Sequence, residues 1–262
     1  NFPLFVFATF IPFVKYASSL NLFGISKHIK IVLIVLLLFL ALFETQQVYV
    51  KKGFGLGVEK GAKDAADFFI TNNLKGPIFN NFDIGSYLDY HLYPKEKVFV
   101  DGRPEAYPAS FFQDIYIPMQ LDENRFEKEN QKYKFNTIFF SHTDQTPWGE
   151  NFIKQVAKNN KWKLVYLDDF TVILTKDPPG GEAGKNIKRI IKTDYSDTRS
   201  LIQLARFFSL ANLEDQEINI YQKILNIDPK FCPALYNLTL KLQARNDPSF
   251  PIYANKFQHN CL

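Results

Sequence analysis

The stretches Gly76–Asn81 (GPIFNN) and Lys97–Arg103 (KVFVDGR) each combine a short apolar run with a polar end. Between them lies one amphipathic stretch, Phe82–Glu96 (FDIGSYLDYHLYPKE), whose spacing predicts a helix. If the two runs are parallel neighbouring strands joined by that helix, their polar ends, Asn80–Asp83 and Asp101–Glu105, lie side by side at the carboxyl edge of one sheet. In open α/β sheets this edge is where ligands bind.

The rest of region 62–176 continues the alternation of helices and strands. We expect helices at Ala62–Leu74, at Ile84–Leu92 with Asp83 as N-cap, at Pro108–Leu121 up to a break before Pro118, at Asn124–Tyr133 and at Trp148–Asn160. We expect strands at Ile78–Asn80, Val98–Val100, Phe135–Phe140, Trp162–Leu167 and Thr171–Thr175. This order predicts an α/β fold, namely a mostly parallel three-layer domain with an antiparallel edge hairpin.

The N-terminal region, residues 1–50, has the pattern of membrane-spanning sequence. Ile31–Phe43 is thirteen uncharged apolar residues, and its flanks extend it to the roughly 20 that a transmembrane helix needs. A buried core helix would show a polar face, and a signal peptide would not follow another apolar stretch such as Phe2–Val14. We therefore predict one full span and, before it, the truncated end of another, so that the chain is a piece of a longer protein.

Charge bears on the topology and on the partners. The short loop Lys15–His28 carries Lys15 and Lys27, which favours a cytoplasmic loop and an extracytoplasmic main domain, although lysines also follow the span. Residues 1–52 carry a net charge of +4, and the remaining 26 basic and 26 acidic residues cancel. The main domain therefore has no positive field to hold nucleic acid, and we expect no nucleic-acid partner.

Beyond region 62–176 the pattern is helical. Residues 51–61 and 177–195 are expected to be linkers, and region 196–262 a tetratricopeptide-like (TPR-like) helical hairpin. The positions that match this 34-residue repeat are Leu201, Leu204, Ala205, Phe208, Tyr221, Ile224 and Pro229, followed by Leu235, Leu238 and Leu242. Glu217 stands where the repeat expects a small residue, and an unrelated helical hairpin is the alternative. Cys232 and Cys261 could be free or paired.

The predicted sheet edge gathers acidic residues, Asp83, Asp101, Glu105 and Asp144, with Arg103 and His142 beside them in the sequence. Paired carboxylates could act as acid and base on a sugar, or Asp101 and Arg103 could bind a polar head group. The structural alternatives are a turn at Asp101, a cap at Asp83 and an internal ion pair. The histidines have no metal-ligand spacing, and no GxSxG or Cys-His arrangement occurs.

The run Phe79–Pro108 (FNNFDIGSYLDYHLYPKEKVFVDGRPEAYP) resembles a stretch shared by the C-terminal extracytoplasmic domains of polytopic bacterial membrane proteins described as glycosyltransferase-like, of the GT-C kind that uses lipid-linked sugars. The resemblance extends over Asn1–Thr175 and includes NFPLF at Asn1–Phe5 and GLGV at Gly55–Val58. Ser86 stands where this family usually has a second glycine.

The resemblance implies a lipid-linked sugar donor for the full-length protein and no cofactor for this chain. The catalytic carboxylate of GT-C enzymes lies in an early external loop that this chain lacks, so we predict no catalytic residue and no metal here. The residues expected to bind a ligand are Asn81, Asp83, Tyr87, Asp101, Arg103 and Glu105.

We therefore expect the C-terminal portion of an integral membrane, GT-C-like envelope protein, with an extracytoplasmic α/β domain that binds an acceptor or partner. The expected partners are the lipid bilayer and a glycan or protein held by the TPR-like helices. The alternative is a non-catalytic, membrane-anchored interaction module. A self-contained glycan hydrolase is a third hypothesis.

Overall fold

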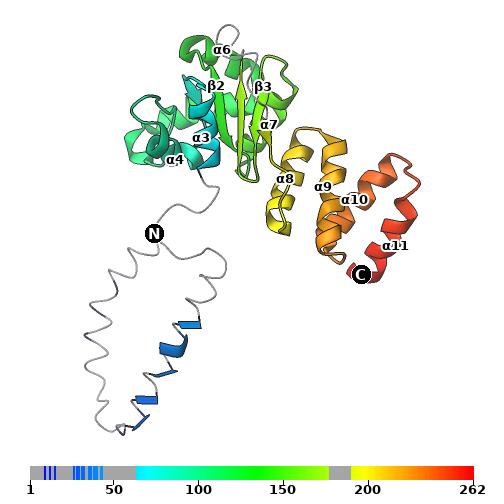
Figure 1. Cartoon of the computed structure of the whole chain (residues 1–262). Helices are drawn as coiled ribbons and strands as arrows, with labels where there is room; N and C mark the ends of the chain where they lie inside the picture. The colour runs from blue at the N-terminus through cyan, green and yellow to red at the C-terminus, as the bar shows by residue number, and fades with distance from the viewer. Residues whose placement is uncertain are drawn as a thin grey trace. The chain divides into compact units, whose positions relative to one another are not determined.

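The computed structural model describes residues 63–176 and 190–262, together with scattered residues between Thr9 and Phe43. The chain divides into two compact units, Asn1–Lys60 and Gly61–Leu262 (Figure 1). The predicted linker 51–61, most of Phe2–Val14 and residues 177–189 lie outside the described residues.

In the first unit, the described residues between His28 and Phe43 have helical backbone. Their apolar side chains are exposed, with Val32 at 64% and Leu42 at 68%. Among the residues that the structure describes, no helix is both long and apolar enough to cross a membrane. Several residues of the predicted span and its flank Thr45–Val50 lie outside that search.

The second unit contains one five-stranded mixed sheet (Figure 1). Its strands are β1 (Ile78–Phe79), β2 (Thr137–Ser141), β3 (Lys163–Leu167), β4 (Thr171–Thr175) and β5 (Ile190–Ile191), in the order β1-β2-β4-β3-β5. The pairs β1–β2 and β3–β5 are parallel, whereas β2–β4 and β3–β4 are antiparallel. The α/β class is confirmed, but the prediction of a mostly parallel sheet is wrong.

The predicted hairpin β3–β4 is present, but it does not form the edge of the sheet. β4 is central, and β3 pairs on its other side with β5, which lies in the stretch expected to be a linker. β5 has only two residues, Ile190 and Ile191, so its sequence carries no alternating pattern that would predict a strand.

The predicted strand Val98–Val100 is also wrong, because this segment has no partner strand among the described residues. The side chain of Asn80 takes the place of one. The Phe99 N–H donates to Asn80 Oδ1 at 2.8 Å, and Asn80 Nδ2 donates to the Val100 carbonyl at 2.7 Å. One amide side chain thus satisfies both backbone groups, and the segment packs beside β1 without extending the sheet.

Helices cover both faces of the sheet. Phe139 of β2 packs in one core with α3 (Asp64–Thr71) and α4 (Phe82–Leu92). Its neighbours Ile138 and Phe140 point to the opposite core, as strand alternation requires. That core contains residues of α5 (Ile117–Leu121), α6 (Glu123–Tyr133) and α7 (Pro147–Lys158).

The helix predicted to break before Pro118 continues through it. Phe111–Tyr116 forms a π-helical turn, η3, in which the Ile117 N–H donates to the Phe112 carbonyl, and α5 follows directly. Pro118 has no N–H for the carbonyl of Asp114, four residues earlier. The guanidinium of Arg125 donates to that carbonyl at 2.8 Å instead, so the freed acceptor is satisfied.

The C-terminal region forms four helices, drawn from yellow to red in Figure 1. They are α8 (Thr198–Leu210), α9 (Glu214–Ile227), α10 (Cys232–Ala244) and α11 (Phe250–Cys261). Most of the residues predicted to anchor the helices are buried, namely Leu201, Leu204, Ala205, Phe208, Tyr221, Ile224, Leu235, Leu238 and Leu242. Pro229 is exposed in the turn that follows α9. The region therefore contains a second helical hairpin, α10–α11, in addition to the predicted one.

Glu217 is 1% exposed in α9, at the position where the repeat pattern expects a small residue. Lys241 of α10 forms an ion pair with it at 3.0 Å, and the hydroxyl of Tyr221 donates to it at 3.3 Å. A buried carboxylate is tolerated when it is paired and hydrogen-bonded. This contact also ties α9 to α10.

Candidate functional site

The ends of β1 and β2 lie side by side and are joined by Asn81. Asn81 Oδ1 accepts a hydrogen bond from the Ser141 N–H at 2.8 Å, and its Nδ2 donates to the Ser141 carbonyl at 3.3 Å and to Asp144 Oδ2 at 3.1 Å. The other oxygen of Asp144 accepts from the Thr146 N–H at 2.8 Å. The polar end of β1 therefore meets the polar end of β2, and this network closes the two strand ends.

Asp83 does not cap α4, contrary to the prediction. The helix begins at Phe82, so Asn81 holds the cap position, but its side chain is engaged with β2. The hydroxyl of Tyr116 accepts from the Phe82 N–H at 2.8 Å instead. Asp83 is exposed in the first turn, and partial burial together with the nearby charge of Asp144 raises its pKa.

Asp101 and Arg103 form an internal ion pair. Asp101 is 3% exposed and accepts from the backbone N–H of Arg103, from its Nε and from its Nη2, the last at 2.5 Å. These bonds to Arg103 lower the pKa of Asp101. The side chain of Arg103 is 66% exposed, so its outer face is open to solvent.

Asp89 of α4 also lies near this pair, although the sequence pattern does not predict it. Burial, followed by the nearby charge of Asp101, raises the pKa of Asp89. The available signal is helical spacing, because Asp89 follows Ser86 by three residues on α4. The Ser86 hydroxyl accepts from the Gly102 N–H at 3.3 Å, so both positions face the same segment.

Gly85 explains why α4 lies so close to that segment. A Cβ at this position would come within 2.1 Å of the Val100 carbonyl oxygen and 2.5 Å of Asp101 Cα. Only glycine permits this approach. Ser86, the next residue, adds the hydrogen bond from the Gly102 N–H and leaves the contact at Gly85 intact.

The remaining predicted residues, Tyr87 and Glu105, have other surroundings. The Tyr87 hydroxyl accepts from the Ala66 N–H of α3 at 3.3 Å, and burial raises the pKa of Tyr87 to about 12. Glu105 is exposed in the short 3₁₀ turn η2 (Pro104–Ala106). The six predicted residues therefore do not form one cluster. Asn81 and Asp83 lie at the strand ends, Asp101 and Arg103 form the pair, and Tyr87 packs on α3.

His142 is buried beneath α8. Its Nε2 lies 2.8 Å from the Asp168 carbonyl, and its ring packs on Phe207 with centroids 5.2 Å apart. Burial lowers the pKa of His142 to about 4, so the imidazole is neutral near pH 7. In the part of the chain that the structure describes, no group of three His, Cys, Asp or Glu residues could hold a metal ion.

A small apolar pocket lies between β2, β4, α7 and Phe207 of α8. Its free volume is about 10 Å³, and no polar atom lines it. This is the space of about one water molecule, far below the several hundred Å³ of an organic ligand site.

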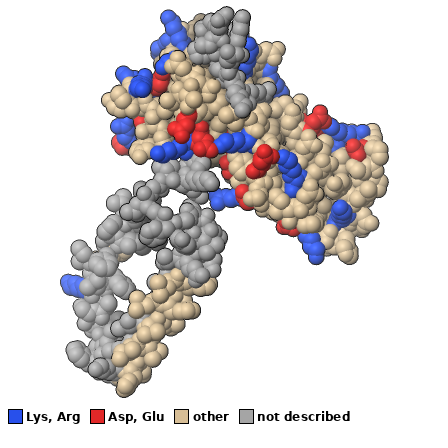
Figure 2. Space-filling view, viewed as in Figure 1, with Lys and Arg blue, Asp and Glu red and all other residues tan. Residues whose placement is uncertain are grey.

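The arrangement is suited to ionic contact at a surface. The two buried carboxylates, Asp101 and Asp144, have their oxygens engaged within the fold. Arg103, Glu105 and Asp83 are the predicted residues that reach solvent. Figure 2 shows Lys and Arg interspersed with Asp and Glu on the visible face, without one extended patch of a single sign.

Comparisons with protein-family models, with curated proteins and with solved structures found no match for this chain.

Proposed function

We propose that this chain is a membrane-anchored, extracytoplasmic interaction module and the C-terminal part of a GT-C-like envelope protein. This proposal rests on the hydrogen bonds that already engage the carboxylates of Asp101 and Asp144. Asp101 and Asp144 are held by Arg103, Asn81 and Thr146, whereas the outer face of Arg103 is exposed. A general acid or base must reach its substrate proton, and these two buried groups are occupied.

Two features support membrane attachment outside the cytoplasm. The described residues between His28 and Phe43 are helical and their apolar side chains are exposed, as a helix surrounded by lipid requires. The structure also pairs Cys232 with Cys261 in a disulfide, which is typical of oxidising compartments.

Acceptor binding within a glycosyltransferase is the second candidate. It is favoured by the exposed guanidinium of Arg103 beside Asp89 and Asp101, within the run Phe79–Pro108 that carries the family resemblance. A planar guanidinium with a free face can bind a phosphate or carboxylate group. In this case the catalytic carboxylate belongs to the full-length protein.

Location and binding are tested separately. A reporter that is active only outside the cytoplasm, fused after Leu262, should be active, and a cytoplasmic activity would contradict the topology. Chemical cross-linking of the native protein in its own cells should give a discrete adduct that Arg103→Ala removes. Lys154→Ala, an exposed change on α7, is the matched control and should keep the adduct.

The two candidates differ in what is cross-linked. A protein adduct favours the interaction module, and a glycolipid adduct favours acceptor binding. If Arg103→Ala leaves every adduct unchanged, the ion-pair surface is not the binding surface.

A further inference from the structure

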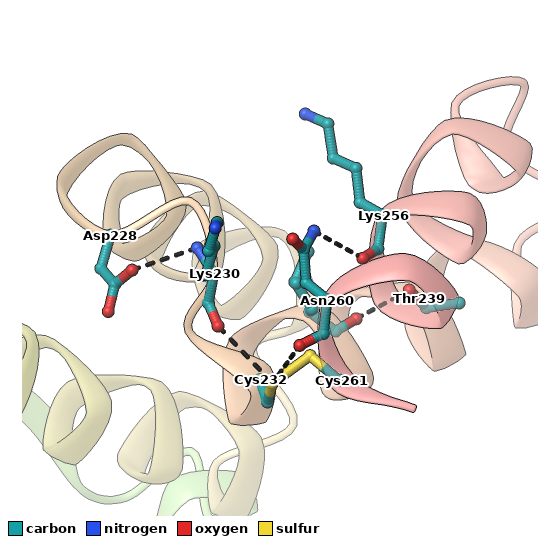
Figure 3. The surroundings of a disulfide bond; sticks show 8 residues. Asp228, Lys230, Cys232, Thr239, Lys256, Asn260 and Cys261 are labelled. Carbon is teal, nitrogen blue, oxygen red and sulfur yellow. Dashed lines mark hydrogen bonds between the residues drawn. A yellow bond between two sulfur atoms is a disulfide. The ribbon is translucent and has the colours of Figure 1, made fainter.

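The last helix, α11, is attached to α10 along one narrow stripe. Cys232 at the start of α10 is bonded to Cys261 at the end of α11, with Cα atoms 5.7 Å apart (Figure 3). Four residues along α10, Tyr236 packs on Phe257, four residues back along α11, with ring centroids 5.6 Å apart. Because side chains four apart share a helix face, the same antiparallel register places Leu240 opposite Tyr253.

This stripe buries little. None of the residues of α11 is buried and Ile252 is 58% exposed, although Phe250, Tyr253 and Phe257 pack, partly buried, against the main core. On α10, Tyr236 remains 49% exposed although it packs on Phe257, and Leu240, four residues further on the same face, is 45% exposed. Apolar burial holds helices together roughly in proportion to the area removed from water, so noncovalent packing holds α11 less firmly than it holds α10, five of whose residues are buried.

The attachment of α10 to the rest of the region does not depend on α11. Leu235, Leu238 and Leu242 are completely or almost completely buried on another face of α10, within the main core. Lys241 also forms its ion pair with the buried Glu217 of α9. Loss of α11 would therefore leave α8–α10 packed.

The two ends of the α10–α11 hairpin are closed in different ways. At the turn, the Asp247 carboxylate accepts from the N–H and hydroxyl of Ser249, both within 2.8 Å. At the open end, the disulfide is the connection. Both cysteines are half-buried and so are not enclosed in the core, and thiol–disulfide exchange requires a thiolate from solvent to reach one of their sulfur atoms.

We propose that the Cys232–Cys261 disulfide is a redox latch that controls the docking of α11. In the oxidised chain the latch holds α11 over the stripe of Tyr236 and Leu240. Reduction releases α11, which stays tethered at Asp247, and exposes the stripe and the facing aromatic rings of Tyr253 and Phe257. The released surface is apolar and aromatic, as is common for protein-binding surfaces.

The chemistry is thiol–disulfide exchange with a dithiol reductant. One thiolate of the dithiol attacks a sulfur of the Cys232–Cys261 bond and displaces the other sulfur as a thiolate, which takes up a proton. The second thiol of the reductant then resolves the mixed disulfide. Two electrons pass to the chain, which gains two thiols, and the reductant becomes a disulfide. The carbonyls of Lys230 and Asn260, 3.5 and 3.8 Å from Cys232 Sγ, are acceptors for the new S–H.

Hydrogen exchange on the whole chain tests the latch. With dithiothreitol, the amides of α11 should lose protection by roughly a hundredfold or more, while those of α8 and α9 change little. The double variant Cys232→Ser, Cys261→Ser should show the same loss without dithiothreitol and no further response to it. Tyr236→Ala keeps the disulfide and should retain most of the protection of α11.

Two results would overturn the proposal. One is an unchanged exchange rate for α11 in both the reduced chain and the double-serine variant. The other is an equal loss of protection throughout α8–α11, which would make the disulfide a general support of the region instead of a latch for one helix.

Discussion

Arg206 of α8 donates a hydrogen bond to the carbonyl of Asp144, the residue whose carboxylate accepts from Asn81 at the strand ends. The same guanidinium donates to the His142 carbonyl at 2.8 Å and to Glu150 of α7 at 2.7 Å. Because one side chain satisfies three groups, α8 is fixed to the loop that carries Asp144.

We predict that Arg206→Ala loosens this connection. Two carbonyls lose their donor, and the free energy of unfolding should fall by about 1–3 kcal/mol. Chemical denaturation measures the change. Arg199→Ala, at an exposed position on the same helix, is the control and should lie within about 0.5 kcal/mol of wild type. Equal stability of the two variants would show that the contact is not significant.

A pair of glycine substitutions tests the close approach of α4. Gly85→Ala places a methyl group against the Val100 backbone, which cannot move without disturbing the buried segment, and should destabilise the protein by about 3 kcal/mol. In Gly102→Ala the new methyl group meets chiefly the Ser86 hydroxyl at 2.8 Å, and that side chain can rotate away. This variant should therefore destabilise the protein by less. Thermal unfolding compares them. The reverse order would contradict the packing described for α4.

Substitutions in the Asp101–Arg103 pair distinguish a role in binding from a role in stability. Arg103→Ala and Asp101→Asn should abolish complementation of a strain that lacks the gene, while both variants stay folded and abundant and their melting temperature falls only by the loss of the side-chain bonds. The reason is that the Arg103 backbone N–H still donates to position 101 in the first variant. Loss of abundance in both variants would instead show that the pair is structural.

His142 predicts a specific dependence of stability on pH. Its folded pKa of about 4 lies below the ordinary value of 6.5, so the unfolded chain binds the extra proton first. This contribution is present in full above pH 6.5 and is lost as the pH falls toward 4, by at most about 3 kcal/mol. Urea unfolding between pH 7 and 4 measures it.

His142→Gln is the matched variant, because glutamine can still donate to the Asp168 carbonyl but does not titrate. The stability of this variant should fall less steeply over the same pH range. The fall that remains comes from the acidic residues, which both proteins share. Parallel profiles for the two proteins would show that His142 does not control the acid response.

The pattern of apolar residues predicted most helices and the antiparallel hairpin, because burial repeats with the period of each element. Leu201, Leu204 and Phe208 are buried as their spacing requires. Two of the failures occur where one side chain replaces a backbone partner. Asn80 pairs with Val98–Val100 in place of a strand, and Arg125 satisfies the carbonyl that Pro118 leaves free.

The candidate site was predicted only in part, again because contacts between distant side chains leave no local pattern in the sequence. The polar end of β1 does lie beside a second polar segment, but its Asn81 side chain reaches β2, sixty residues along the chain, which local spacing cannot reveal. Asp89 was not predicted because it comes near Asp101 only through the close contact that Gly85 allows between α4 and the Val100–Asp101 backbone. Long-range hydrogen bonds of this kind leave no periodic signal.

The two outer strands of the sheet, β1 and β5, are each two residues long. An exposed strand edge is a template for pairing with another chain, and short outer strands offer few free backbone groups for it. At β1, Asn80 and the segment beside it occupy part of that edge. Copies of this domain crowded on one surface would therefore have little tendency to join edge to edge into aggregates.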